Sequence, residues 1–76
     1  MNKKKQTRTE SYLRKVVELG PDNAEYQFFL GICLINQDKF IEAEPFFRRA
    51  VELDPDNTEY QYYLGGCLGN QGKDAE

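Results

Sequence analysis

The chain has 76 residues, of which 39% are hydrophobic and 30% are charged, and its net charge at pH 7 is −3. A chain of this length forms at most one small domain, and it lacks room for a deep catalytic cleft between two lobes. No apolar run approaches the roughly 18–20 residues of a membrane-spanning helix, so we expect no membrane partner.

The first eight residues differ in charge from the rest of the chain. Lys3, Lys4, Lys5 and Arg8 give them a charge of +4, while the remainder carries 6 basic and 13 acidic side chains. We expect residues 1–8 to be a disordered basic leader, because they show no apolar periodicity. The alternative is an electrostatic contact with an anionic partner. The polar N-terminus shows no signal peptide, which favours a cytoplasmic location.

A period of 34 residues runs through the sequence. Residues 21–54 form one period, and 14 of 22 pairs are identical when residues 21–42 are laid over residues 55–76. The same shift lays residues 12–19 over residues 46–53. Periods of this size are typical of stacked repeat proteins. The positions at which this period begins and ends predict a repeat domain over residues 9–76. It consists of a half repeat at 9–20, a full repeat at 21–54 and a half repeat at 55–76.

The first predicted helix begins near Thr9–Ser11. Its apolar face consists of Tyr12, Leu13, Val16, Val17 and Leu19. We expect Gly20-Pro21 to end this helix, since Gly fits a left-handed C-terminal position and Pro cannot continue the hydrogen-bond ladder.

The second predicted helix is capped by Asp22 or Asn23 and runs to about Asn36. Asp22 and Glu25 have the spacing of a capping box. Two apolar stripes follow the helical period: Tyr26, Phe29, Leu30, Cys33 and Leu34 form one, and Phe28, Ile32 and Ile35 form the other. Two stripes indicate two neighbours, or one neighbour and a ligand. Gly31 costs about 1 kcal/mol of helix propensity, so we expect another helix to approach closely there.

Two further helices are predicted after a tight turn at residues 37–39. The third covers about 40–53, and its main stripe consists of Phe40, Ala43, Phe47, Ala50 and Val51. The fourth covers about 58–70, and its stripe consists of Tyr60, Tyr63, Leu64, Cys67 and Leu68. Because the fourth helix also contains Gly65, Gly66 and Gly69, we expect it to be weak unless other elements pack on both of its sides.

The sequence offers little reactive chemistry. It contains no His, and its two cysteines, Cys33 and Cys67, lie one period apart. A zinc site needs about four N or S ligands, so we expect no metal and no cofactor. We expect both cysteines to be core residues that lie too far apart for a disulfide. Without a His or a Gly-rich phosphate loop, we also expect no enzymatic activity.

The 34-residue helix–turn–helix pattern resembles the tetratricopeptide repeat family. Residues at the spacings of that family's signature are Leu30, Gly31, Ala43, Phe47, Ala50, Pro55, Leu64 and Gly65. The chain departs from the family at Gln27 and Gln61, where Trp is most frequent. The resemblance implies an all-α solenoid of antiparallel helix hairpins, in which about four helices follow the order B-A-B-A.

The same resemblance implies a concave face that binds peptides or partner helices. Carried over by position, its lining is Glu25, Phe28, Phe29, Ile32, Ile35, Asn36, Glu59, Tyr62, Tyr63, Gly66 and Asn70. The Lys and Asn clamp that some members use for acidic chaperone tails is absent, since its places hold Phe28, Ile32 and Tyr63. An apolar or basic segment would suit this face better. The alternative for Phe28, Ile32 and Tyr62 is the core between helices.

These features predict a non-catalytic protein–protein interaction or scaffold module. The first and last helices each lack a partner, so we expect a homo-oligomer in which they pair between chains. The candidates for this packing are Tyr12, Leu13, Val16, Val17, Tyr60, Tyr63, Leu64, Cys67 and Leu68. One alternative is a fragment of a longer array that binds a peptide in its concave groove. A helical repeat that binds RNA is a further alternative, but the acidic repeat region argues against a nucleic-acid partner.

Overall fold

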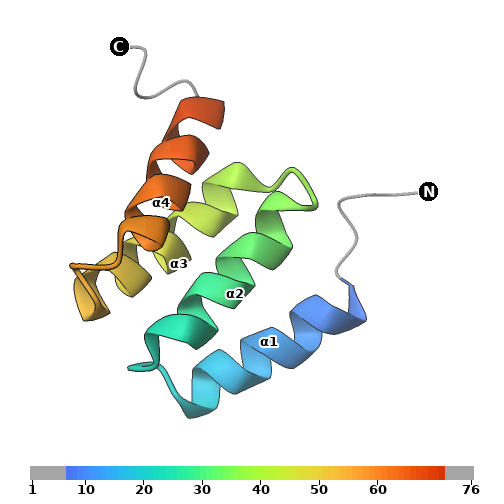
Figure 1. Cartoon of the computed structure of the whole chain (residues 1–76). Helices are drawn as coiled ribbons and strands as arrows, with labels where there is room; N and C mark the ends of the chain where they lie inside the picture. The colour runs from blue at the N-terminus through green and yellow to red at the C-terminus, as the bar shows by residue number, and fades with distance from the viewer. Residues whose placement is uncertain (1–6, 72–76) are drawn as a thin grey trace.

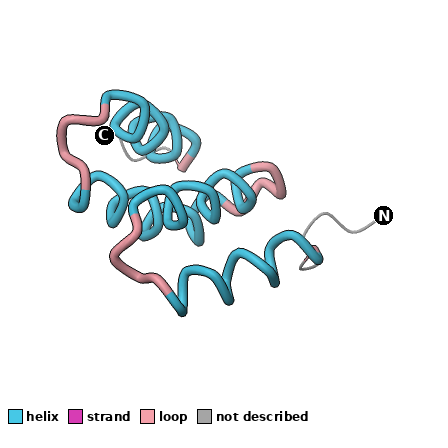
Figure 2. Tube along the Cα trace, turned by 60° about the horizontal axis from the view of Figure 1, so that its bottom comes forward, coloured by secondary structure: helices cyan, strands magenta, loops and turns pink. Residues whose placement is uncertain are grey.

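The computed structural model describes residues 7–71, which form four helices (Figure 1). These are α1 (Arg8–Leu19), α2 (Ala24–Ile35), α3 (Phe40–Leu53) and α4 (Thr58–Asn70). Each helix packs mainly against its neighbours in the chain, and α1 and α4 lie at the two ends of the stack (Figure 2). No strand occurs within residues 7–71. The predicted all-α stack of helix hairpins is therefore confirmed.

Three of the helices begin at a polar side chain that caps a free backbone amide. The Thr7 hydroxyl accepts a hydrogen bond from the Glu10 amide at 3.0 Å, and the Asn23 and Asn57 side chains do the same for Tyr26 and Tyr60 at 3.1 Å. Helix α1 thus begins one residue before the predicted start. Thr7 and Arg8 belong to this helix and its cap rather than to the predicted leader, whose residues 1–6 lie outside the described residues.

Two local predictions were wrong. Asp22 and Glu25 form no capping box; Asn23 caps α2, and Asp22 instead accepts a hydrogen bond from Arg49 Nη2 at 3.0 Å. Gly20 has φ −135°, so it is not left-handed. A residue before proline is pushed out of the helical region into more extended conformations, and Asp54, which precedes Pro55, has a similar φ of −142°. The positive φ occurs at Asp38, in the turn between α2 and α3.

The core lies between α2, α3 and α4. It consists of Phe28, Leu30, Leu34, Ala43, Phe47, Ala50, Tyr60 and Cys67. Phe47 is fully buried, and its ring lies 5.8 Å from the ring of Phe28 and 5.9 Å from the ring of Tyr63. A Cβ atom at Gly31 would lie 2.7 Å from Phe47 Cε1. The close approach of another helix predicted at Gly31 is therefore confirmed, and the approaching side chain is Phe47.

The two cysteines are free thiols in unlike surroundings. Cys67 is buried, and its Sγ lies 3.1 Å from the carbonyl oxygen of Phe40. Cys33 is only half-buried, and its Sγ lies near the side chains of Thr7 and Gln37. Cys67 thus occupies the predicted core position, whereas Cys33 lies where α1 meets α2.

Replacing Gly31 with alanine tests this close packing. We expect Gly31→Ala to lower the free energy of unfolding by about 1–2 kcal/mol, because overpacking costs about 1–3 kcal/mol and outweighs the gain in helix propensity. The matched control is Gly66→Ala in α4, where an added Cβ would meet nothing within 4 Å. Urea unfolding at low protein concentration measures both variants. Equal midpoints for the two would contradict the close packing.

Candidate protein interaction surfaces

The residues predicted to line a concave groove occupy three different environments. Phe28 is buried, and its ring lies 4.7 Å from that of Tyr60 and 5.2 Å from that of Tyr63. It therefore belongs to the core between helices, which corrects its placement in a groove. Glu25 and Glu59 are exposed in the first turns of α2 and α4. The other candidates lie around two separate hollows.

The first hollow, of about 410 Å³, lies between α1 and α2, and the groove candidates among its lining residues are Phe29, Ile32 and Asn36. The second, of about 530 Å³, lies beside α4, and its lining includes Ile35, Tyr62, Tyr63, Gly66 and Asn70. The groove candidates in the described part of the chain thus do not come together in one site.

The residues predicted to pack between chains also differ in how far they are exposed. On α4, Tyr60 and Cys67 are only 5% and 3% exposed, so both are buried within their own chain rather than free for a partner. Tyr63 and Leu64 are partly buried against the same core. On α1, Leu13 and Val17 pack partly against the core, Val16 is half-buried and Tyr12 is exposed. Leu68 on α4 is half-buried.

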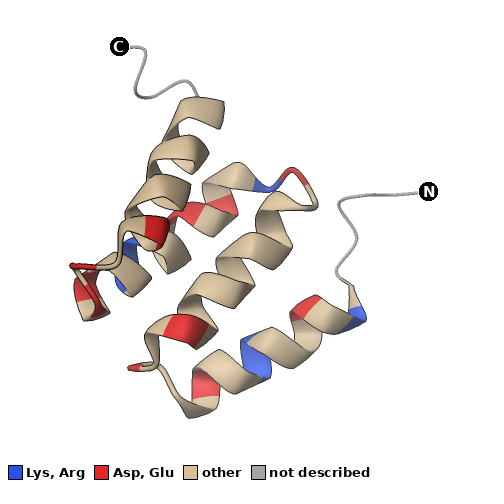
Figure 3. Ribbon diagram, viewed as in Figure 1, with Lys and Arg blue, Asp and Glu red and all other residues tan. Residues whose placement is uncertain are grey.

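Helix α4 nevertheless has an open face, which consists of Tyr62, Gly65, Gly66 and Gly69. The side chain of Tyr62 is 75% exposed. An added Cβ at Gly65 or Gly66 would meet nothing within 4 Å. Glu59 is the single charged residue of this helix (Figure 3). The four residues of the open α4 face are therefore uncharged, and three of them lack a side chain. Sequence reasoning placed some of these residues in a groove but did not identify the face.

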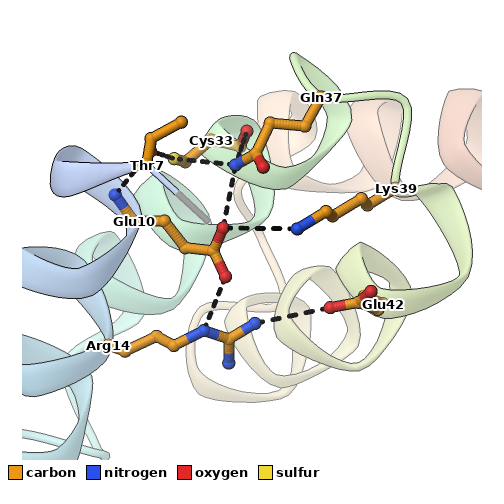
Figure 4. A network of polar contacts seen from close by, with 7 residues as sticks. All are labelled: Thr7, Glu10, Arg14, Cys33, Gln37, Lys39 and Glu42. Carbon is orange, nitrogen blue, oxygen red and sulfur yellow. Dashed lines mark hydrogen bonds and ion pairs between the residues drawn. The ribbon is translucent and has the colours of Figure 1, made fainter. Parts of the chain in front are cut away.

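At the other end of the stack, a polar network joins α1 to the α2–α3 turn (Figure 4). The Glu10 carboxylate accepts hydrogen bonds from Arg14 Nε at 2.8 Å and from Gln37 Nε2 at 3.0 Å, and Lys39 Nζ lies 3.6 Å away. Arg14 also lies 3.5 Å from the Glu42 carboxylate on α3. This network positions α1 against the rest of the stack.

Burial and hydrogen bonding act on Glu10 in opposite directions. Its side chain is 2% exposed, and burial alone raises the pKa of a carboxyl group. The hydrogen bonds from Arg14 and Gln37, together with the charges of Arg14 and Lys39, outweigh this effect, so the pKa of Glu10 is lowered. Sequence reasoning missed this network. The available signal was the recurrence of Glu10 and Arg14 one period later as Glu44 and Arg48, which form an ion pair at 2.7 Å.

Residues 7–71 contain neither a membrane-spanning helix nor a cluster of metal ligands. None of the helices there is both long enough and apolar enough to cross a membrane. The same residues contain no group of three or more His, Cys, Asp or Glu side chains placed to hold a metal ion.

The helices α2 and α3 form an antiparallel hairpin that α1 and α4 continue on either side, which defines a protein of stacked helical hairpins. Residues 24–57 match the tetratricopeptide repeat family. The matched segment covers α2, α3 and the turn up to the cap of α4. Comparison with curated proteins finds no match for the chain.

The Glu10 network predicts a specific dependence of stability on acid pH. Because the pKa of Glu10 is lower in the folded chain, the unfolded chain binds more protons in acid, so the stabilisation is present at neutral pH and is lost as the pH falls below the ordinary carboxyl pKa of 4.5 and through the lowered pKa of the folded chain. We expect Glu10→Gln to cost about 1–3 kcal/mol at pH 7 and much less at pH 3.

Chemical unfolding at pH 7, 5, 4 and 3 measures this difference. The matched control is Glu18→Gln, on an exposed position of the same helix, which should stay within about 0.5 kcal/mol of the wild type at pH 7. A Glu10→Gln profile parallel to that of the wild type over the whole range would contradict the role of the network.

Proposed function

We propose that the chain is a non-catalytic scaffold that associates with further copies of itself through the helices at the two ends of the stack. The match of residues 24–57 to the tetratricopeptide repeat family supports a role as a protein–protein interaction module. The self-association is supported by the side chains that remain exposed on the end helices.

The observation that carries the proposal is the contrast between Phe28 and Tyr62. The two residues are period counterparts, which means that they lie 34 positions apart at the same place in the repeat. Phe28 is 7% exposed because α3 and α4 cover it, whereas Tyr62 is 75% exposed on the open α4 face. An aromatic side chain at this position is thus buried once a further hairpin follows it. A second copy of the chain supplies such a hairpin.

The two ends of the stack are different surfaces, so their contact is heterologous. Such a contact leaves one free α1 and one free α4 after each addition, so it produces an open filament unless the two free ends meet and close a ring. The association is therefore expected to continue beyond a dimer as the protein concentration rises.

A second candidate function is peptide binding within a longer array of the same repeats. The observation that favours it is the hollow beside α4, whose lining is uncharged and includes the aromatic residues Phe40, Tyr62 and Tyr63. In that case neighbouring repeats of the same chain would cover both ends, and the 76-residue chain alone would be a monomer.

Light scattering after size exclusion, at several concentrations, distinguishes the two functions. Self-association predicts a mass that rises with concentration above the 8.9 kDa of one chain. A mass of one chain at every concentration would contradict it and would direct attention to a peptide ligand.

We expect Tyr62→Glu to abolish or strongly reduce the association, because it places a charge on the open α4 face. The matched control is Ile41→Glu on α3, which changes the charge equally at a side chain that is 76% exposed. The control should associate like the wild type. Equal loss of mass in the two variants would show that the contact does not involve the open α4 face.

A further inference from the structure

Within one chain, α3 packs beside α2, but no described helix packs at the equivalent place beside α4. We infer that α1 of a second copy lies beside α4 as α3 lies beside α2, with Leu13 of that copy over Gly65. This inference rests on the proposed self-association and adds the register and the contacting residues. The 34-residue period supplies the correspondence, since α1 is the counterpart of α3 and α4 is the counterpart of α2.

The central contact is between a large side chain and a glycine. Phe47 fits against Gly31, where a Cβ atom would lie 2.7 Å from its ring. The counterpart of Phe47 is Leu13, and the counterpart of Gly31 is Gly65. Leu13 is half-buried, and nothing in the described chain lies within 4 Å of a Cβ added at Gly65. The pair Leu13–Gly65 therefore has the same complementary shapes, and its two members lie on opposite ends of the stack.

The aromatic side chains correspond in the same way. Phe28 is covered by Phe47, Tyr60 and Tyr63, at ring distances of 5.8, 4.7 and 5.2 Å. The counterparts predict that Tyr62 is covered by Leu13, Tyr26 and Phe29 of the second copy. Tyr26 and Phe29 are 37% and 46% exposed in the single chain. The docking thus buries exposed aromatic side chains from both partners in one cluster.

In this register, one ion pair of the single chain has an opposite-charge counterpart between the two copies. Arg49 on α3 pairs with Asp22 before α2 at 3.0 Å, and the counterparts are Lys15 and Asp56, both of which are exposed. One pair changes: Arg14 lies 3.5 Å from Glu42, whereas the counterparts, Arg48 and Arg8, have like charges.

The charge pairs allow a reversal experiment on the full chain, with dissociation constants from sedimentation equilibrium. We expect Lys15→Glu and Asp56→Lys to weaken association by roughly 2- to 10-fold each. The double variant, which restores an opposite-charge pair between copies, should return close to the wild-type constant. Additive weakening in the double variant would overturn the register.

The glycines allow a second experiment. Gly65→Ala and Gly66→Ala both raise helix propensity, but a Cβ at Gly65 intrudes on the space assigned to Leu13. The counterpart of Gly66 is Ile32, so this position accepts a side chain. We expect Gly65→Ala to weaken association at least about 5-fold and Gly66→Ala to leave it unchanged or tighter. Equal constants for the two variants would overturn the inference.

A gain of affinity completes the test. Arg8→Glu replaces the like-charged pair of Arg8 and Arg48 by an opposite-charge pair, so association should tighten by roughly 2- to 5-fold. A wild-type chain that is monomeric throughout overturns both the register and the proposed function. If the wild-type chain assembles, but the charge reversals and Gly65→Ala leave its dissociation constant unchanged, the register alone is overturned.

Discussion

The packing of Phe47 against Gly31 is the constraint on which the rest of the structure depends. The missing side chain at Gly31 brings α3 close to α2, and the buried ring of Phe47 then contacts Phe28 and Tyr63 as well. One side chain thus joins α2, α3 and α4. Since stability in repeat proteins is roughly a sum of units and nearest-neighbour interfaces, this contact also shows what an end helix lacks. The glycine-rich α4 is covered on one side only.

Much of the fold could be predicted from the sequence, because the 34-residue period and the apolar stripes record the packing directly. The third and fourth helices lie where the stripes placed them, and Gly31 marks a close approach because a glycine inside a helix needs a packing reason. Asn23 was one of two residues predicted to cap α2, and it does so in the structure, as its counterpart Asn57 does for α4.

The remaining errors share a physical cause, which is that one sequence position does not reveal what covers it. The stripe containing Phe28 was compatible with a groove or a core, and the rings of α4 decided the matter. Tyr60 and Cys67 were also predicted to pack between chains, but both are buried within their own chain. The sequence patterns assigned no role to Glu10. Its burial depends on Gln37 and Lys39, which the turn between α2 and α3 brings to α1.

The central claim is that copies of the chain meet in the register by which the repeat packs within one chain. The most direct measurement is an isotope-filtered nuclear Overhauser experiment on associated protein, in which labelled and unlabelled chains are mixed so that only contacts between chains appear. The account predicts cross-peaks between the ring of Tyr62 and the side chains of Leu13 and Tyr26. Cross-peaks that join two α4 helices, with none from Tyr62 to α1 or α2, would contradict it.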